Sequence, residues 1–134
     1  MESTVRRLNP DEVKALLDAG TEFTYLDVRS VEEFRAGHVP GAVNVPLMQR
    51  GPAGTGLVPN PAFLAQVNAL FQKDTRLITG CLRGGRSLKA ATLLLHDGFS
   101  SVTDMRGGFD GEVGASGQLT CPGWARRGYP VSTG

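Results

Sequence analysis

The stretch RLITGCLRGGRSLKAATLLLHDG, residues 76–98, decides the fold. Its first five residues predict a short strand, Arg76–Gly80, because they carry an apolar pair and end at a glycine. After a turn at residues 81–86, a mostly apolar segment predicts a helix from Ser87 to about His96, closed by Gly98. A strand that leads directly into a helix is the first half of a parallel crossover, since parallel strands cannot be joined by a tight hairpin.

The same alternation of strands and helices runs through the rest of the chain. Asn9 is a helix-capping residue followed by a proline and two acidic residues, which predicts a helix that ends at Gly20. Ser30 is likewise expected to cap a short helix that ends at Gly37. This order predicts the α/β class, with a central, mostly parallel sheet of four or five strands flanked by helices. The other predicted elements are a strand Phe23–Asp27, a shorter strand Ala42–Leu47, a loop Gln49–Asn60, a helix begun by Asn60 and Pro61 with an apolar stripe of Phe63, Val67, Leu70 and Phe71, and a last strand Val102–Met105.

The length and charge of the chain argue against several classes of protein. Its 134 residues, 40% of them hydrophobic, are the size of one domain spanning residues 1–134. With 14 basic and 13 acidic residues the formal charge is +1, which disfavours a protein that binds the nucleic-acid backbone. The longest stretch without acidic or basic residues, Gly51–Gln72, holds three prolines and cannot be a membrane-spanning helix, and Met1–Arg7 lacks the apolar run of a signal peptide. We therefore expect a soluble, cytoplasmic protein with no nucleic-acid or membrane partner.

Cys81 stands where the predicted strand turns into the predicted helix. Backbone N–H groups and the positive end of a helix dipole converge at such a position and stabilise a thiolate. Arg83 and Arg86 add positive charge, while Gly84 and Gly85 permit backbone conformations in which amides point inward. The loop is therefore interpreted as an anion cradle with Cys81 as the nucleophile. The alternative is an inert, buried thiol in a glycine turn.

The length of this loop indicates which anion it holds. Four residues separate Cys81 from Arg86, one fewer than in the phosphate cradle of cysteine phosphatases, and Ser87 occupies the position where that cradle has its arginine. A shorter loop makes a narrower cradle, which suits one sulfur atom better than a phosphoryl or arsenoryl group. A cysteine phosphatase or arsenate reductase is therefore the less favoured function.

The loop CLRGGRS, residues 81–87, resembles the active-site loop of single-domain rhodaneses, the thiosulfate sulfurtransferase family. Residues 45–67 are in addition similar to the small plant-type sulfurtransferases and their bacterial relatives. The resemblance covers nearly the whole chain and implies the rhodanese-like three-layer fold. The other matching stretches are LDVR (26–29), EF (33–34), GHVPGA (37–42), NVP (44–46), GF (98–99), Val102, GG (107–108) and GYPV (128–131).

The resemblance implies transfer of a sulfane sulfur in two steps. The Cys81 thiolate takes the outer sulfur of thiosulfate or a similar donor, and a thiol such as glutathione or a thioredoxin-like protein, or cyanide in an assay, then accepts it. The resemblance implies no metal and no organic cofactor. An alternative is a rhodanese-fold module that binds or senses with little turnover. The residues implied to bind the substrate and the persulfide are Leu82, Arg83, Gly84, Gly85, Arg86 and Ser87.

Charged residues around the loop have predicted supporting roles. Arg83 is expected to face an anionic donor, whereas Arg86 is expected to turn inward and pair with Glu33 or Asp27. The resemblance implies that Asp27 and Arg29 belong to a scaffold of ion pairs and hydrogen bonds. Because a thiolate nucleophile needs no base, both histidines are interpreted as structural: a turn residue, His38, and a surface residue at a helix end, His96.

One segment departs from the family pattern. A tryptophan commonly follows the Gly-Gly pair within a few residues, but 15 residues separate Trp124 from Gly107-Gly108, with an extra segment at Glu112–Gly123 between them. That segment carries Cys121, so it could form a lid or bring a second thiol near Cys81. A surface loop with a buried or idle cysteine is the favoured interpretation, and a disulfide between the two cysteines stays open.

Overall fold

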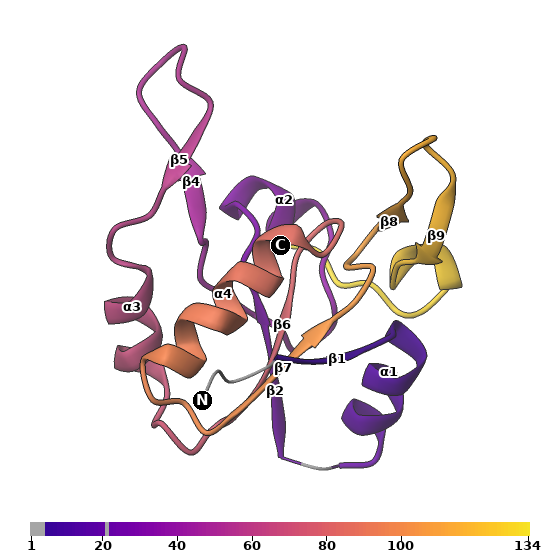
Figure 1. The fold of residues 1–134 in the computed structure, drawn as a ribbon, viewed down its shortest axis with the longest axis horizontal. Coiled ribbons are helices and arrows are strands. Elements are labelled where there is room, and N and C mark those ends of the chain that lie inside the picture. Colours follow the sequence, from indigo (N-terminus) through magenta and orange to yellow (C-terminus); the bar gives the residue numbers. More distant parts are fainter. Residues whose placement is uncertain (1–4, 21) are drawn as a thin grey trace.

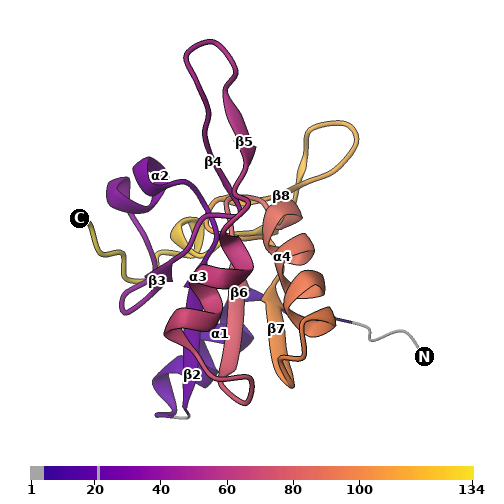
Figure 2. The same ribbon diagram turned by 90° about the vertical axis from the view of Figure 1, so that its left-hand side faces the viewer.

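A five-stranded parallel sheet with the strand order β1-β7-β6-β2-β3 forms the centre of the computed structural model, which describes residues 5–20 and 22–134 (Figure 1). Helices lie on both faces of this sheet (Figures 1 and 2). The predicted α/β class, with a central parallel sheet flanked by helices, is therefore confirmed. The strands of the sheet are β1 (Arg6–Leu8), β2 (Phe23–Asp27), β3 (Val43–Asn44), β6 (Arg76–Gly80) and β7 (Ser101–Met105), and the helices are α1 (Pro10–Asp18), α2 (Val31–Ala36), α3 (Phe63–Leu70), α4 (Gly85–His96) and a 3-10 turn at Ala125–Arg127.

The first two helices each begin with a reciprocal pair of capping bonds. At α1 the Asn9 side chain accepts from the Glu12 amide at 2.9 Å, and the Glu12 carboxylate accepts from the Asn9 amide at 3.0 Å. Ser30 and Glu33 form the same pair at α2, at 3.3 and 3.2 Å. Because these bonds satisfy amides that a helix leaves unpaired, the local sequence is enough to define both helix starts. The predicted starts of both helices are confirmed.

The strands direct alternate side chains to two separate cores. Leu26 and Leu77 pack on one face of the sheet with the buried residues of α3 and α4. Tyr25 and Ile78 pack on the other face, where α1 supplies Val13. Because both faces are covered, neither face of the central strands is open to water, and their carboxyl ends are left as the accessible edge of the sheet.

The predicted loop Gln49–Asn60 is instead an antiparallel hairpin made of β4 (Met48–Arg50) and β5 (Leu57–Pro59). The Gly51 N–H closes its bend by donating to the Gly56 carbonyl at 2.8 Å. Gly56 has a φ of +68°, a conformation that favours glycine. The glycines that indicated a loop therefore build a tight bend, and the hairpin projects from the body of the protein (Figures 1 and 2).

Edge strands are the second difference from the prediction. The strand expected at Ala42–Leu47 is reduced to β3, which lies at the edge of the sheet and pairs only with β2. The opposite edge is β1, which was not predicted and pairs with β7. Val102–Met105 is not the last strand, because β8 (Gly111–Val113) and β9 (Leu119–Pro122) form a further hairpin. The two edge strands depend on partners far away in the sequence, whereas β8 and β9 pair with each other.

Two helices differ from the prediction at their starts. The Asn60 side chain accepts from the Ala62 amide at 3.0 Å, which makes a turn ahead of α3 and delays its start. Leu70 is 57% exposed and so lies outside the buried stripe of α3. α4 begins at Gly85, two residues before the predicted Ser87.

Within residues 5–20 and 22–134, no helix is both long and apolar enough to cross a membrane. The first four residues of the stretch Met1–Arg7 lie outside the described residues. The assignment of residues 1–134 to one domain stays a prediction.

Candidate active site

Cys81 lies at the carboxyl end of β6, where the chain turns into α4. Its side chain is 2% exposed, and its Sγ accepts a hydrogen bond from the Gly84 N–H at 3.0 Å. Gly84 has a φ of +108°, so the chain reverses in a conformation that favours glycine and returns this amide to the sulfur. The predicted position of Cys81 between a strand end and a helix start is confirmed. The sulfur therefore has a backbone donor beside the positive end of a helix.

A second stretch of backbone holds the Cys81 loop in place. The Phe109 N–H donates to the Cys81 carbonyl at 2.7 Å, and the Asp110 N–H donates to the Leu82 carbonyl at 2.9 Å. Gly108 lies so close that a Cβ atom there would be 2.5 Å from the Cys81 carbonyl oxygen, and its φ is +62°. The glycine pair at 107–108 is thus required by the close approach of two backbones.

Arg86 turns away from the loop opening and pairs with Glu33, one of the two partners predicted for it. Its two terminal nitrogens donate to the two Glu33 oxygens at 2.8 and 3.0 Å. Burial opposes ionisation of Glu33, but the bonds from Arg86 and Ser30 outweigh it and lower the Glu33 pKa to about 2. The same pair raises the Arg86 pKa, with a smaller contribution from Cys81. Arg86 therefore links α4 to α2 and adds positive charge near the sulfur.

Arg83 stays at the rim of the loop. Its side chain is 52% exposed and lies 3.6 Å from the Asp110 carboxylate, which also pairs with Arg126 at 3.1 Å. Its other contact is the Gly111 carbonyl, to which it donates at 3.5 Å. These are long, exposed contacts that hold an arginine weakly. The predicted role of Arg83 in binding the donor stays a prediction.

Asp27 and Arg29 form a buried ion pair beside the site. The Arg29 Nη2 donates to Asp27 at 2.8 Å, and the Arg29 backbone N–H donates to the same carboxylate at 2.9 Å. Arg29 also donates to the Gly37 carbonyl at 2.6 Å, and its guanidinium stacks 4.5 Å from the Phe109 ring centre. Asn44 donates to the carbonyls of both members of the pair at 3.0 Å. These bonds have the geometry of the scaffold that the resemblance implied.

The two histidines have the surroundings predicted for them. His38 is buried, its Nδ1 donates to the Phe34 carbonyl at 2.7 Å, and its ring stacks on Phe34. His96 is exposed at the last residue of α4. The contacts of His38 are thus structural, and His96 lies on the surface.

Two buried polar groups near the loop were not singled out from the sequence. Burial raises the Tyr25 pKa well above its ordinary value, and the charges of Asp27 and Cys81 add to this effect, so Tyr25 remains a neutral phenol. A Cβ atom on Gly80 would overlap the Tyr25 hydroxyl. The other group is Asp104, fully buried on β7. The sequence signal for such a group is a polar residue at a strand position that faces the core.

The extra segment forms a hairpin whose two ends meet. The Gly123 N–H donates to the Asp110 carbonyl at 3.1 Å, and the Trp124 N–H donates to the Gly108 carbonyl at 2.9 Å. Trp124 therefore returns to the glycine pair despite the insertion, and it is buried in the α1 core. The hairpin holds β8 and β9, so the inserted residues do not prevent Trp124 from reaching the glycine pair.

Cys121 lies on β9 and is a free thiol, as is Cys81. Its Sγ lies 3.6 Å from an Arg127 nitrogen and 4.0 Å from the Arg106 carbonyl oxygen. A Cβ atom on Gly107 would be 3.0 Å from this Sγ. Cys121 is thus packed against the glycine pair, which agrees with the favoured interpretation of a buried cysteine.

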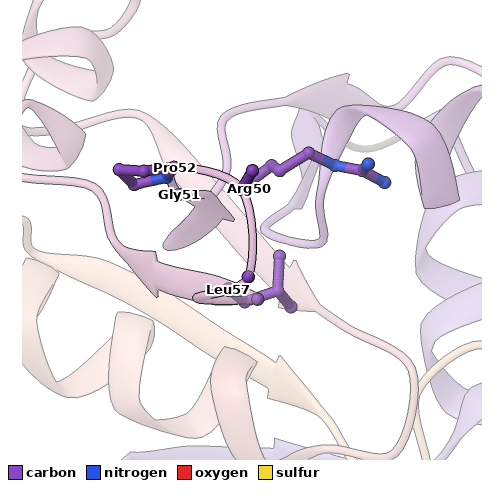
Figure 3. Close-up of a pocket in the computed structure, with 7 residues that line it drawn as sticks. Arg50, Gly51, Pro52 and Leu57 are labelled. Carbon is purple, nitrogen blue, oxygen red and sulfur yellow. The ribbon is translucent and has the colours of Figure 1, made fainter.

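One hollow, of about 550 Å³, lies in the bend of the β4–β5 hairpin and not at Cys81 (Figure 3). Its lining includes glycine, proline and leucine. The Arg50 side chain points away from the hollow (Figure 3), and its Nε lies 3.3 Å from the Glu32 carboxylate. This hollow offers no nucleophile, so the chemistry of Cys81 identifies the candidate site. In the described part of the chain, no group of three or more His, Cys, Asp or Glu side chains is arranged to hold a metal ion.

Comparisons with known proteins agree with this geometry. A family model described as a Rhodanese-like domain matches residues 9–113. The Arabidopsis thaliana protein named thiosulfate sulfurtransferase 16, chloroplastic, is 46% identical over 107 residues, which are 80% of this chain and 78% of that protein. The Raphanus sativus senescence-associated protein DIN1 is 48% identical over 96 residues, which are 72% of this chain and 50% of that protein. A crystal structure of Rv0390 from M. tuberculosis has the same fold, with a TM-score of 0.79 at 24% identity, over 98% of this chain and 100% of that one.

These relatives differ in length and in the compartment that they are named for. The chain spans about three quarters of the first plant relative and half of the second. Several plant relatives are named as chloroplastic or mitochondrial, which does not support the predicted cytoplasmic location. The location of this protein stays a prediction.

Proposed function

Because the chain belongs to the rhodanese-like family, we propose that it is a thiosulfate sulfurtransferase that carries the sulfur on Cys81. Relatives named thiosulfate sulfurtransferase in plants and bacteria support a sulfurtransferase role at the level of the family. The observation that carries the proposal is the Gly84 N–H that donates to the Cys81 Sγ at 3.0 Å. A sulfur that accepts a backbone bond beside a helix N-terminus is stabilised as a thiolate.

In the first step, the Cys81 thiolate attacks the outer sulfur of thiosulfate. The sulfur–sulfur bond of the donor breaks, sulfite leaves with the bonding electron pair, and Cys81 becomes a persulfide. The negative charge moves to the outer sulfur of that persulfide, where the backbone amides of residues 82–87 are its proposed donors. The narrow loop has room for this one sulfur atom at the start of α4.

In the second step, a nucleophilic acceptor attacks the outer sulfur of the persulfide. The bond between the two sulfur atoms breaks, its electron pair stays on Cys81, and the thiolate is restored. Cyanide serves as the acceptor in an assay. A small thiol such as glutathione, or a thioredoxin-like protein, is the proposed acceptor in the cell.

The alternative is a rhodanese-fold module that binds or senses with little turnover. The relatives named only for a rhodanese-like domain or for senescence are compatible with either function. Cys81 favours the enzyme, because a module without turnover has no need of a nucleophile in the loop. A cysteine phosphatase or arsenate reductase is less favoured, because only four residues separate Cys81 from Arg86.

The decisive experiment is intact-mass measurement after incubation with thiosulfate. The wild-type protein should gain one sulfur atom, about 32 Da, and pass it to cyanide. Cys81→Ser should gain nothing and transfer nothing, whereas Cys121→Ser, the matched control, should behave like the wild type.

Each contrary outcome favours a different function. Transfer that survives in Cys81→Ser would rule out this mechanism. A folded wild-type protein that gains no sulfur would favour the binding module, and turnover of a phosphate ester or of arsenate instead would favour the phosphatase or reductase.

A further inference from the structure

A buried carboxylate lies beneath the Cys81 loop, and an arginine from the edge of the sheet covers it. Arg7 on β1 is directly opposite Asp104 on β7 in the parallel ladder, so their side chains lie on the same face. The Arg7 Nε donates to the Asp104 Oδ2 at 3.0 Å. The Asp104 side chain is 0% exposed, while that of Arg7 is 32% exposed. The pair therefore joins a wholly buried negative charge to a positive charge that reaches the surface.

Hydrogen bonds connect this carboxylate to the loop. The Thr79 hydroxyl, two residues before Cys81, donates to the Asp104 Oδ1 at 3.1 Å. The Ser87 hydroxyl lies within reach of both the Asp104 carboxylate and the Gly84 carbonyl, which is 3.3 Å away. Gly84 is the residue whose amide donates to the Cys81 sulfur. Asp104 is thus bonded to Thr79 just before the loop and lies near Ser87, whose hydroxyl donates to the residue that contacts the sulfur.

Arg7 also lies beside the loop. A Cβ atom on Gly84 would lie 3.2 Å from the Arg7 Nη2, which places the guanidinium against the backbone of the residue that bonds Cys81. Arg7 can lie here because Gly84 has no side chain to fill the space. One guanidinium therefore bonds to the buried carboxylate and lies beside the loop that holds the sulfur.

The charges explain why such a pair is needed. A thiolate or persulfide on Cys81 is repelled by an ionised carboxylate beneath it, and repulsion between charges is strong where water is excluded. Burial raises the Asp104 pKa, and bonds from Ser87, Arg7 and Thr79 oppose this effect. The other ionisable groups around the sulfur and around Arg7 are Tyr25, Asp27 and Arg29 on or after β2, Glu33 on α2, Arg83 in the loop, Arg86 on α4, Arg106 after β7, Asp110 before β8, and Glu112 on β8.

We propose that Arg7 is a positioning residue of the Cys81 site, which cancels the charge of Asp104 and so allows a negative sulfur to form above it. The proposal rests on the proposed function, because it takes Cys81 as the nucleophile. Arg7 does not touch the reacting atoms. It acts through Asp104 and through the backbone of Gly84.

The test measures how alkylation of Cys81 by iodoacetamide depends on pH. It uses the full chain with Cys121→Ser, so that Cys81 is the one thiol that reacts. Arg7→Gln should shift the midpoint of the rate profile upward by about one pH unit, because the uncancelled carboxylate disfavours the thiolate. Arg7→Lys should keep the midpoint near that of the parent. Arg7→Gln combined with Asp104→Asn should restore it, because both charges are then gone.

Arg6→Gln is the matched control, since Arg6 is the adjacent arginine of β1, exposed and on the opposite face of the strand. It removes the same net charge and should leave the midpoint unchanged. Thermal unfolding of every variant is recorded alongside, because a purely structural Arg7 lowers the melting temperature without moving the midpoint.

An unchanged midpoint in folded Arg7→Gln overturns the proposal, and so does a double variant that stays shifted. Alkylation does not require sulfur transfer, so this result is separate from that of the thiosulfate experiment. A shifted midpoint in a protein that takes no sulfur from thiosulfate would support the proposed role of Arg7 and reject the sulfurtransferase function.

Discussion

At the scale of single residues, the two arginines of the Cys81 loop have different surroundings. Arg86 is fixed by two short bonds to Glu33, whereas Arg83 is half-exposed and held by one long ion pair to Asp110. An arginine that is already paired through both nitrogens has little left to offer a ligand, while a loosely held one can reorient. Arg83 is therefore the proposed contact for the sulfonate end of thiosulfate.

Arg83→Ala should raise the KM for thiosulfate by about three- to tenfold and lower kcat less, because the lost contact binds the donor in the ground state. Arg126→Ala is the matched control, because Arg126 is equally exposed and shares the Asp110 carboxylate. Steady-state kinetics of transfer to cyanide give both constants. An unchanged KM in Arg83→Ala, or an equal rise in both variants, would show that Arg83 does not bind the donor.

At the scale of elements, Glu33 joins two helices. Its Oε1 accepts from the Ser30 amide, which caps α2, and also from Arg86, which lies in the first turn of α4. The start of α2 and the start of α4 are therefore held by one carboxylate. The loop of Cys81 lies directly before α4, so this ion pair fixes the element that carries the site.

Glu33→Gln should destabilise the protein by about 1–2 kcal/mol at pH 7, a value reduced for solvent screening because the pair is partly exposed. The Glu33 pKa is lowered from 4.5 to about 2, so its contribution is complete above pH 4.5. It is lost as the pH falls from 4.5 through 2, where Glu33 takes up a proton in the folded state. Urea unfolding of the wild type and the variant should therefore give a stability difference that shrinks over this interval.

Glu32→Gln is the control for this experiment, because Glu32 is the adjacent residue of α2 and pairs with Arg50 on the surface. Its side chain is 57% exposed, so the change should have little effect on stability at pH 7 or at pH 3. A stability difference for Glu33→Gln that stays constant from pH 7 to pH 3 would contradict the assignment of the lowered pKa to the ion pair.

At the scale of the whole molecule, the C-terminal part of the chain closes the fold. His38 and Ser132 exchange two backbone bonds at 2.9 Å, and Arg127 pairs with Asp11 of α1 at 2.9 Å. The β8–β9 hairpin comes just before these C-terminal residues in the sequence. Cys121 is carried by this hairpin, so its distance from Cys81 is set by the tertiary structure and not by the 39 residues between them.

Cys121→Ser should leave the lifetime of the Cys81 persulfide unchanged after thiosulfate loading without an acceptor. The reason is that the Cys121 thiol is buried against Gly107 and Arg127, which leaves it little freedom to move toward Cys81. The lifetime is measured by intact mass at successive times. Faster loss of sulfur in the wild type, together with a disulfide between the two cysteines, would show instead that Cys121 resolves the persulfide.

The parts of the structure that depend on neighbouring residues were predictable from the sequence. The caps at Asn9 and Ser30, the strand Arg76–Gly80 and the position of Cys81 all follow from residues a few positions apart. The capping bonds are local, so the same pattern has the same result in most contexts. The strand was recognisable from its own apolar residues, although its hydrogen bonds go to β2 and β7. The α/β class follows for the same reason, because it is the order of such local elements.

The tertiary structure decided what depends on residues far apart in the chain. β1 is a strand only because β7 offers it an edge, and β3 is a strand because it pairs with β2. Arg7 and Asp104 meet across 97 positions, and neither residue indicates the other in the sequence. A short strand or a lone charge has too little local free energy to define its own partner, so these features exist only once the sheet has brought both sides together.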